Sequence, residues 1–330
     1  MSSEHATGTE NRSEAPKIRV IFMGTPEFAR DILSGLVTAG FNVVAVYTRP
    51  DRPVGRNRAI SEPPVKTFAK EQGIAVEQPE RFDEETIRKL TEYHPDLIIV
   101  AAYGRILPET VLAIPGFGCL NVHASLLPRW RGASPVQNAL LSGDTETGVT
   151  IMLMDKGLDT GPILAQRTMP VSDSDTRETL LSRMAIDGVM LLSETVPRWI
   201  ERRCEPAPQD SEKATLCELI EREDGHIFWN EDATTILNRF RGLSPWPGIF
   251  TFWKRQDGRV RLKLTAISIQ RTDPAVKHSF GEVFEIGEHI AVQAGTGLVF
   301  IDGIQPEGKA PMSIRDFVNG RPDFIGSILE

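Results

Sequence analysis

The residues of this sequence whose types and spacing most clearly suggest chemistry are Asn121 and His123, two positions apart in a run typical of a buried strand. At the two-residue period of a strand, both side chains point to one face, while Leu120 and Val122 point to the other. Asn donates and accepts hydrogen bonds, and His also titrates near neutral pH, so the pair could hold a carbonyl oxygen as negative charge develops on it. The pattern therefore favours acyl transfer. The alternative is that both side chains only satisfy backbone groups where a strand meets a loop.

Asp159 is a carboxylate that could serve this pair. It lies between two glycines, after an apolar run at 148–153, and the glycines allow the backbone to turn tightly. Asp159 could orient His123 or accept the proton released when an amine attacks a carbonyl. The alternative is an Asx turn, which is common for Asp-Thr-Gly. Asp155 is the competing carboxylate and ranks second, because it ends the strand run and could simply cap a turn or form an ion pair.

The amino-terminal half must position these groups, and its pattern predicts strands that alternate with helices. Apolar, β-branched runs at 19–23, 42–47 and 97–102 predict strands, and the spacing at 83–94 predicts a helix. This alternation predicts an α/β fold with a doubly wound, mainly parallel, Rossmann-like sheet that has helices on both faces. Ligands bind at the carboxyl ends of the strands in such sheets. The segments expected there are Arg105–Leu107, Asn121–Pro128 and Asp159.

The carboxyl-terminal part of the chain has a different character. A long helix is predicted at 176–202, and short β-rich pieces separated by Gly and Pro then predict a small barrel. The strands expected in this barrel are 248–253, 260–269, 281–286, 290–293 and 298–301. The predicted organisation is a disordered tail at 1–16, a catalytic domain at 17–204, a Pro-rich linker at 205–211 and a C-terminal β-barrel domain at 212–330.

Composition and pattern exclude several classes of protein. No apolar run approaches the roughly 18 residues of a transmembrane helix, and the first fifteen residues lack the charged and apolar regions of a signal peptide. The three cysteines are widely spaced, which predicts neither a disulfide framework nor a zinc knuckle and fits a reducing cytoplasm. Gly24 follows the first strand, but the Gly-x-Gly-x-x-Gly spacing is absent, so a nicotinamide site is rejected.

The net charge of −8 argues against a protein that coats nucleic acid nonspecifically, but it leaves room for a local basic surface. Such a surface is predicted in a Pro- and Gly-containing loop that carries a single Asp51 and four arginines. These are Arg49, Arg52, Arg56 and Arg58. The planar fork of Arg suits phosphates and base edges, and the alternative is a solvated loop. A second basic run is interleaved with aromatic residues, which are more often core than stacking surfaces. It comprises Arg239, Arg241, Lys254, Arg255, Arg259, Arg261 and Lys263.

Six segments resemble the folate-dependent formyltransferases, and the resemblance extends from about Ile18 to Asn319. The segments are Phe22–Phe28, Arg49–Arg56, Ala101–Pro108, Asn121–Gly132, Gly157–Gly161 and Pro245–Gly248. The Asn, His and Asp elements recur across formyltransferases of several substrates, so they specify the reaction type. The long Leu-Leu-Pro-Arg-Trp-Arg-Gly form, the Arg-rich loop and the C-terminal segment together resemble the enzymes that act on methionyl-tRNA. Ala124 stands where Gly is frequent in relatives, which is a small departure.

The resemblance implies a catalytic set and two binding regions. The catalytic set is Asn121, His123 and Asp159. The tetrahydrofolate site is Ser125, Leu126, Leu127 and Pro128, with Arg105, Ile106 and Leu107 completing a slot for the pterin ring. The implied activity is transfer of a formyl group from 10-formyltetrahydrofolate to the α-amino group of methionyl initiator tRNA in the cytoplasm. The 49–58 loop and a C-terminal barrel of the oligonucleotide-binding type would contact the tRNA. No metal or nucleotide cofactor is implied, and we expect a monomer.

Two other functions stay open. A formyltransferase for a small amine, such as glycinamide ribonucleotide or an amino-sugar nucleotide, would share Asn121, His123 and Asp159. Such an enzyme needs neither the 49–58 loop nor a β domain after residue 212. The other alternative is a non-catalytic RNA-binding module with an inactive α/β half. The intact set of three residues argues against it, and a formyl-transfer assay would decide.

Overall fold

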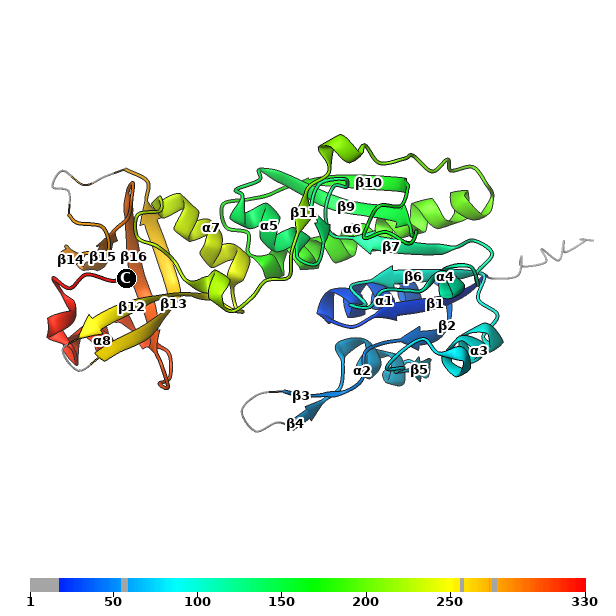
Figure 1. Ribbon diagram of the computed structural model, residues 1–330, viewed down its shortest axis with the longest axis horizontal. Helices are drawn as coiled ribbons and strands as arrows, with labels where there is room; N and C mark the ends of the chain where they lie inside the picture. Colours follow the sequence, from blue (N-terminus) through cyan, green and yellow to red (C-terminus); the bar gives the residue numbers. More distant parts are fainter. Residues whose placement is uncertain (1–17, 55–58, 256–257, 273, 275–277) are drawn as a thin grey trace, which may run out of the picture. The chain divides into compact units, whose positions relative to one another are not determined.

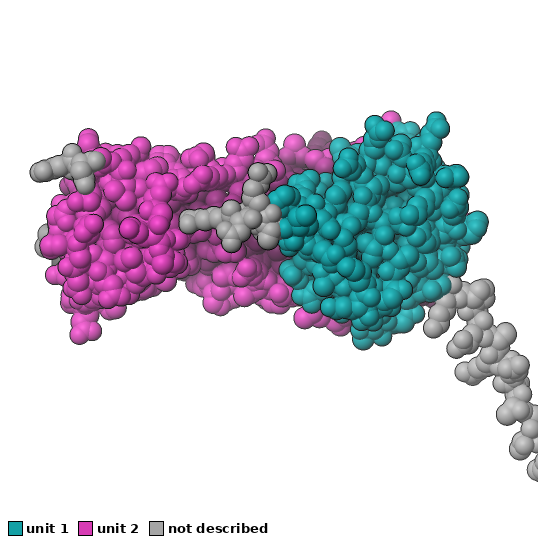
Figure 2. Space-filling model, turned by 90° about the horizontal axis from the view of Figure 1, so that it is seen from below, with its two compact units in different colours: residues 1–121 teal, residues 122–330 magenta. Residues whose placement is uncertain are grey.

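The computed structural model describes residues 18–54, 59–255, 258–272, 274 and 278–330. The chain divides into two compact units, Met1–Asn121 and Val122–Glu330, which Figure 2 colours separately. The division falls within strand β7 (Cys119–His123), so this strand belongs to both units. The tail expected at 1–16 lies outside the described residues, and the domain boundaries expected at 204 and 212 remain predictions.

The first unit contains a parallel sheet with the strand order β7-β6-β1-β2-β5 (Figure 1). Besides β7, its strands are β1 (Arg19–Gly24), β2 (Asn42–Tyr47), β5 (Ala75–Glu77) and β6 (Leu97–Ala101). Its helices are α1 (Glu27–Thr38), α2 (Pro64–Glu71), α3 (Glu84–Glu92) and α4 (Glu109–Leu112). Every residue of β6 is buried, as expected for an apolar strand inside a parallel sheet. The strands predicted at 19–23, 42–47 and 97–102 are confirmed.

The helix predicted at 83–94 is confirmed as α3, and its start has a local cause. Asp83 is the N-cap residue, and its carboxylate accepts a hydrogen bond from the Thr86 N–H at 3.0 Å. Glu84 and Glu85 in the first turn, with Lys89 in the last, complement the helix dipole. The cap thus marks where the segment that leaves β5 ends and the helix begins.

The arginine-rich loop contains a short hairpin that the sequence does not predict. Strand β3 (Arg52–Val54) pairs antiparallel with β4 (Ala59–Ser61), and Figure 1 shows the pair projecting from the rest of the first unit. Pro53 argues against a strand in the middle of a sheet, but a two-stranded hairpin tolerates it because each strand has an open edge. Arg56 and Arg58 lie outside the described residues.

The second unit begins with the end of β7, beside which strands follow in the order β10-β9-β7. Strands β9 (Glu146–Leu153) and β10 (Ile163–Pro170) are antiparallel. The sequence does not predict β10, because its polar residues interrupt the apolar run. Strands β8 (Arg131–Gly132) and β11 (Leu216–Cys217) form a short parallel pair.

Three helices complete this part of the second unit: α5 (Pro135–Leu141), α6 (Arg177–Ile200) and α7 (Ala233–Leu243). The helix predicted at 176–202 is confirmed as α6. Thr176 and Thr179 form a capping box at its start, in which each side chain bonds to the backbone N–H of the other. This reciprocal cap explains why the helix begins where the chain leaves Ser172–Asp175. The sequence does not predict α7.

The rest of the second unit is a curled antiparallel sheet with the order β12-β13-β16-β15-β14. The strands are β12 (Ile249–Arg255), β13 (Gly258–Gln270), β14 (Val283–Ile286), β15 (His289–Gln293) and β16 (Leu298–Pro306), with β17 (Met312–Ser313) pairing with β16. The chain then forms α8 (Ile314–Asn319). The last residues bridge both outer strands, Leu329 opposite Trp253 and Ile328 opposite Glu282. The predicted small barrel is therefore confirmed as a half-barrel whose edges meet through the end of the chain.

The interior of this half-barrel is apolar. Residues from its strands, from α7 and α8 and from the segments next to these helices form one buried cluster that includes Trp229, Ile236, Trp253, Val292 and Phe324. None of the helices in the described part of the chain is both long and apolar enough to cross a membrane.

Candidate functional site

Strand β7 carries Asn121 and His123 at its carboxyl end. Val100 of β6 lies opposite Asn121 in the parallel ladder, which fixes the register of this end. Strand alternation directs Asn121 and His123 to one face and Val122 to the other, where Val122 is buried. The His123 side chain is itself buried, with 5% of its surface exposed. An imidazole buried at the end of a strand needs hydrogen-bonding partners.

The two ring nitrogens of His123 face different partners. Nε2 donates to the Trp130 carbonyl at 2.9 Å, and Nδ1 lies 3.6 Å from Oδ2 of Asp159. The Trp130 carbonyl can only accept a hydrogen bond, so Nε2 must carry the proton in this contact. The 3.6 Å separation exceeds a normal hydrogen bond but brings the carboxylate within ion-pairing distance of a protonated ring. The structure thus brings His123 and Asp159 together.

The loop that presents Asp159 is held in a tight turn. Asp159 has a positive φ of 52°, a conformation that side chains other than Gly adopt infrequently. Its Oδ2 accepts a hydrogen bond from the Gly132 N–H at 2.9 Å. Gly161 is required by close packing, because a Cβ there would lie 1.8 Å from the Leu153 carbonyl oxygen. The position of the carboxylate is therefore set by the turn of the Asp159 backbone and by the hydrogen bond from Gly132.

Asp155 occupies a different role in the same loop. Its Oδ1 accepts from the Gly157 N–H at 2.9 Å and from the Thr160 hydroxyl at 2.7 Å. Hydrogen bonds of this kind, from an Asp side chain to groups just after it in the chain, are typical of an Asx turn. The Asp155 side chain therefore stabilises the loop itself, whereas the Asp159 side chain lies beside His123.

Gln209 is a positioning residue that the sequence reasoning missed. Its Nε2 donates to the carbonyls of Asp159 at 2.8 Å and Gly161 at 2.7 Å, while its Oε1 accepts from Arg131 Nε at 3.0 Å. It lies in the segment that the sequence predicts as a linker, and a single Gln in a Pro-rich stretch carries no signal of its own. Only the folded chain shows that this segment supports the Asp159 loop.

The four residues predicted to bind folate after β7 are largely committed to bonds within the second unit. The Ser125 hydroxyl donates to the Arg129 carbonyl at 2.6 Å. The Leu127 N–H donates to Thr150 Oγ1 at 3.1 Å, and its carbonyl accepts from Gln166. Ser125 and Leu127 are buried, whereas Leu126 and Pro128 are partly exposed. A ligand would therefore meet the side chains of Leu126 and Pro128 first.

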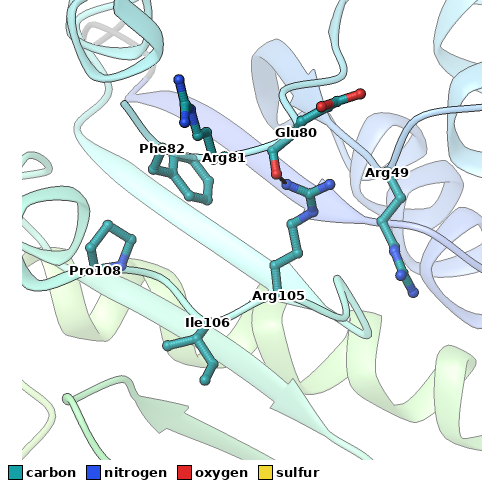
Figure 3. A pocket seen from close by; sticks show the side chains of 7 residues that line it. All are labelled: Arg49, Glu80, Arg81, Phe82, Arg105, Ile106 and Pro108. Carbon is teal, nitrogen blue, oxygen red and sulfur yellow. Dashed lines mark hydrogen bonds between the residues drawn. The ribbon is translucent and has the colours of Figure 1, made fainter. Parts of the chain in front are cut away.

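The other predicted folate residues lie in the first unit, around a cavity of about 520 Å³. Arg105 and Ile106 line it, whereas Leu107 is buried. Arg49, predicted to contact tRNA, lines the same cavity (Figure 3). The structure thus brings Arg49 and Arg105 together, a grouping that the sequence does not indicate. Arg52 is exposed on β3 and does not line this cavity.

Two arginines of the second basic run are committed to bonds within the second unit. Arg239 bonds to Glu231, and Arg241 donates to the Ser172 carbonyl at 2.8 Å, so both serve the structure of the second unit. Arg259 and Arg261 lie over the rings of Phe252 and Phe250, with 3.7 Å from each guanidinium carbon to the ring centroid. Phe250 is buried, as expected for an aromatic core residue in this run.

The described residues contain no group of three or more His, Cys, Asp or Glu side chains arranged to hold a metal ion.

Comparison with known proteins identifies the family. Residues 16–196 match the formyl transferase family, and residues 219–322 match the formyl transferase C-terminal domain. A methionyl-tRNA formyltransferase of Caldanaerobacter subterraneus is 42% identical over 315 residues, which cover 95% of this chain and 100% of that relative. A methionyl-tRNA formyltransferase of Gluconobacter oxydans is 43% identical over 307 residues, covering 92% of this chain and 97% of that relative.

Solved structures share the fold at lower identity. HypX from Aquifex aeolicus in complex with tetrahydrofolic acid has a TM-score of 0.62 at 17% identity, over 92% of this chain and 47% of that chain. An N-formyltransferase from Helicobacter canadensis, in complex with folinic acid and dTDP-3-aminofucose, has a TM-score of 0.62 at 18% identity, over 86% of this chain and 99% of that chain. From the sequence matches over nearly its full length, the chain belongs to the formyl transferase family.

Proposed function

We propose that this protein transfers a formyl group from 10-formyltetrahydrofolate to the α-amino group of methionyl initiator tRNA and so supports translation initiation in the cytoplasm. The observation that carries the proposal is the likeness over 95% of the chain to a relative with that activity in its name. The closeness of His123, at the end of β7, to Asp159, in the loop after β9, supports the reaction type, because the transfer needs both a donor to an oxyanion and a proton acceptor.

In the proposed reaction, the neutral amine of the methionyl group attacks the formyl carbon. A bond forms between the amine nitrogen and that carbon, and the carbonyl oxygen becomes an oxyanion. Asn121 and His123 donate hydrogen bonds to this oxyanion. The bond between the formyl carbon and the folate nitrogen then breaks, and the proton from the amine passes to that nitrogen, directly or through water, with the help of Asp159.

The geometry adds one requirement to this scheme. His123 Nε2–H is directed at the Trp130 carbonyl, and Nδ1 faces Asp159. To donate Nε2–H to an oxyanion, His123 must lengthen or exchange its bond to Trp130. Asp159 lies on the opposite side of the ring, 3.6 Å from Nδ1, and can hold its orientation while this exchange occurs.

The binding regions are also proposals. The folate would contact Arg105, Ile106 and Leu107, and Ser125 to Pro128. The tRNA phosphates would contact Arg49, Arg52, Arg56 and Arg58, and the domain at 212–330 would extend the tRNA surface. The enzyme would act as a monomer and would need no metal.

The proposal is tested by mixing the purified protein with donor that carries a labelled formyl group. Charged initiator tRNA, free methionine and glycinamide ribonucleotide are compared as acceptors. Label should appear on the charged tRNA at a much higher kcat/KM than on either small amine. Preferential labelling of glycinamide ribonucleotide would replace the proposal by a small-amine formyltransferase, and no labelling of any acceptor would favour a non-catalytic RNA-binding role.

A further inference from the structure

The Trp130 carbonyl, which accepts from His123 Nε2, belongs to a residue held in an uncommon backbone conformation. Trp130 has a positive φ of 61°, in the left-handed region that few side chains other than Gly adopt. Its indole N–H donates to Asp144 at 2.9 Å, and the Arg129 guanidinium, bonded to the same carboxylate at 2.6 Å, lies over the indole ring. Such a conformation persists only where the surrounding structure fixes it. The contacts that fix the Trp130 peptide group therefore also set the position of the carbonyl that holds His123.

Strand β11 and the residue before it hold the backbone of this segment. The Trp130 N–H donates to Thr215 Oγ1 at 2.8 Å, and the Arg131 N–H donates to the Thr215 carbonyl at 2.8 Å. Gly132 lies so close to β11 that a Cβ there would be 2.2 Å from the Cys217 carbonyl oxygen. The same Gly132 N–H donates to the Asp159 carboxylate at 2.9 Å. A segment far along the chain thus supports the backbone groups that contact both His123 and Asp159.

The Cys217 thiol approaches the Trp130 carbonyl from this segment. Its Sγ lies 3.4 Å from the Trp130 carbonyl oxygen and 3.3 Å from the Arg131 carbonyl oxygen, and Cys217 is buried. Burial raises the pKa of Cys217, so the thiol keeps its proton at neutral pH. A single S–H group can donate fully to only one of the two carbonyls at a time. The thiol is therefore a donor with two acceptors within reach.

Two donors meet at the Trp130 carbonyl oxygen, His123 Nε2–H and the Cys217 thiol. If Nε2–H turns to an oxyanion, a carbonyl with no second donor is left unpaired, which opposes the turn. Rotation of the S–H group about the Cβ–Sγ bond, from the Arg131 carbonyl to the Trp130 carbonyl, removes this opposition. Arg131 keeps its place in the ladder between β8 and β11 when the thiol leaves it.

We propose that Thr215 and Cys217 are positioning residues for His123. Thr215 holds the Trp130 peptide group so that its carbonyl directs His123 Nε2, and the Cys217 thiol bonds to this carbonyl while Nε2–H is on the oxyanion. The thiol proton stays on sulfur, so no covalent bond forms or breaks at Cys217. The inference rests on the proposed function, in which His123 donates to the oxyanion. A segment that only packed against β8 would need neither the Thr215 hydroxyl nor the thiol.

The first test needs no catalysis. Proton–nitrogen NMR follows the exchange of the His123 Nε2 proton with solvent, and the signal is assigned by its loss in His123→Ala. Thr215→Val leaves the Trp130 N–H without its acceptor, so this proton should exchange about tenfold faster, the effect of one lost hydrogen bond. Thr215→Ser keeps the hydroxyl and should exchange as the parent does. Thr179→Val is the matched control, because Thr179 Oγ1 accepts the Thr176 N–H at 2.9 Å, at the start of α6.

The second test measures formylation of charged initiator tRNA. Cys217→Ala should lower kcat by about tenfold with little change in KM for either substrate, because the thiol acts only while His123 is on the oxyanion. Exchange of the His123 Nε2 proton in the free protein should stay at the parental rate in this variant. Cys217→Ser keeps a donor and should retain most of kcat. Cys204→Ala is the matched control, since its thiol also donates to a backbone carbonyl, that of Leu164 at 3.5 Å.

The outcomes separate positioning from a merely structural role. A lower unfolding temperature in Thr215→Val, with parental proton exchange and kcat, would show that Thr215 only stabilises the fold. Parental kcat in Cys217→Ala, or an equal loss in Cys217→Ser, would overturn the role of the thiol, because donation would then not matter. A parent protein that does not formylate tRNA would overturn the proposed function, while the exchange rates would still decide whether Thr215 positions His123.

Discussion

The surroundings of His123 and the cavity beside Arg49 differ in how their polar groups are satisfied. Around His123, Nε2 bonds to the Trp130 carbonyl, and Asp159 accepts from Gly132. Beside the cavity, the Tyr103 hydroxyl and the Arg49 Nε have no partner among the described residues. The polar groups around His123 are therefore bonded to one another within the protein. Beside the cavity, the Tyr103 hydroxyl and the Arg49 Nε are donors to which no described protein group is bonded.

This difference separates two uses of polar side chains. Groups that stabilise a developing charge work best when they are already held close to their working position, because little reorganisation is then needed during the reaction. For His123 that reorganisation is the exchange of its bond to Trp130. Groups that bind a charged ligand can remain unpaired until it arrives, at a cost in stability that binding repays. The comparison therefore predicts large losses of turnover from substitutions near His123, and small or favourable changes in stability from substitutions near Arg49.

The largest effects are expected from Asn121→Ala and His123→Ala. Each should lower kcat by about 100- to 1000-fold, because each removes one donor to the oxyanion. Binding of tRNA should persist. Single-turnover formylation measures the first quantity and filter binding the second, with His289→Ala, an exposed residue of β15, as control. A variant that turns over at the parental rate would take that residue out of the catalytic set, and loss of tRNA binding would indicate misfolding or a binding role.

Asp159→Asn should come next, with kcat lower by about 100-fold or more, within the range for general acid–base groups. The change keeps the size of the side chain but removes the charge beside His123. Asp155→Asn is the matched control in the same loop. Asn can still accept at Oδ1 from Gly157 and Thr160, so the turn should survive. If single-turnover rates ranked the two variants in the opposite order, the carboxylate role would move to Asp155.

The elements that the sequence predicts well are those with strong local signals. The strands β1, β2 and β6 are continuous apolar runs, and α3 and α6 begin at the capping residues Asp83 and Thr176. Strand β10 could not be predicted in this way, because it pairs at an edge and carries polar residues along its length. Helix α7 could not be predicted in this way either, because its apolar face is explained only by the half-barrel core that it covers.

The candidate site could likewise be predicted only where a local sequence signal exists. Asn121 and His123 could be paired from sequence because strand periodicity alone puts them on one face. The closeness of His123 and Asp159 depends on long-range folding, and Gln209 could not have been found because its bonds reach residues about fifty positions away. The cavity was also not predictable, since Arg49 and Arg105 follow two different strands and only the sheet brings them together.

A smaller effect, on the free energy of unfolding, is expected from Thr150→Val in the hydrogen-bonded region that follows His123. The buried Thr150 hydroxyl donates to the Ser125 carbonyl at 2.6 Å and accepts from the Leu127 N–H at 3.1 Å. Val has the same shape but leaves both backbone groups unpaired, so the free energy of unfolding should fall by about 1–3 kcal/mol. Urea unfolding measures this loss. The exposed Thr91→Val is the control and should change stability by less than about 0.5 kcal/mol. Equal losses in both would show that the Thr150 bonds contribute nothing specific.

The smallest effect, and the one of opposite sign, is expected from Tyr103→Phe. The change removes a buried hydroxyl that has no partner, so the free energy of unfolding should stay the same or rise by about 1 kcal/mol. Tyr93→Phe is the matched control in the same unit, because the Tyr93 hydroxyl donates to Glu77 at 2.7 Å. Its loss should lower the free energy of unfolding by about 1 kcal/mol.

The pH dependence gives Tyr103→Phe a second readout. Burial raises the pKa of Tyr103 to about 12, against the opposing effect of the charges on Arg105 and Arg49. In the unfolded chain the phenol ionises near pH 10, about the value of a free tyrosine. The unfolded state therefore releases a proton first, and the parent should lose stability as the pH rises from about 10 toward about 12. Tyr103→Phe lacks this loss, so its advantage over the parent should grow with pH in urea unfolding. A variant that is less stable than the parent at neutral pH would show that the hydroxyl has a partner, and the contrast between the two regions would then fail at this residue.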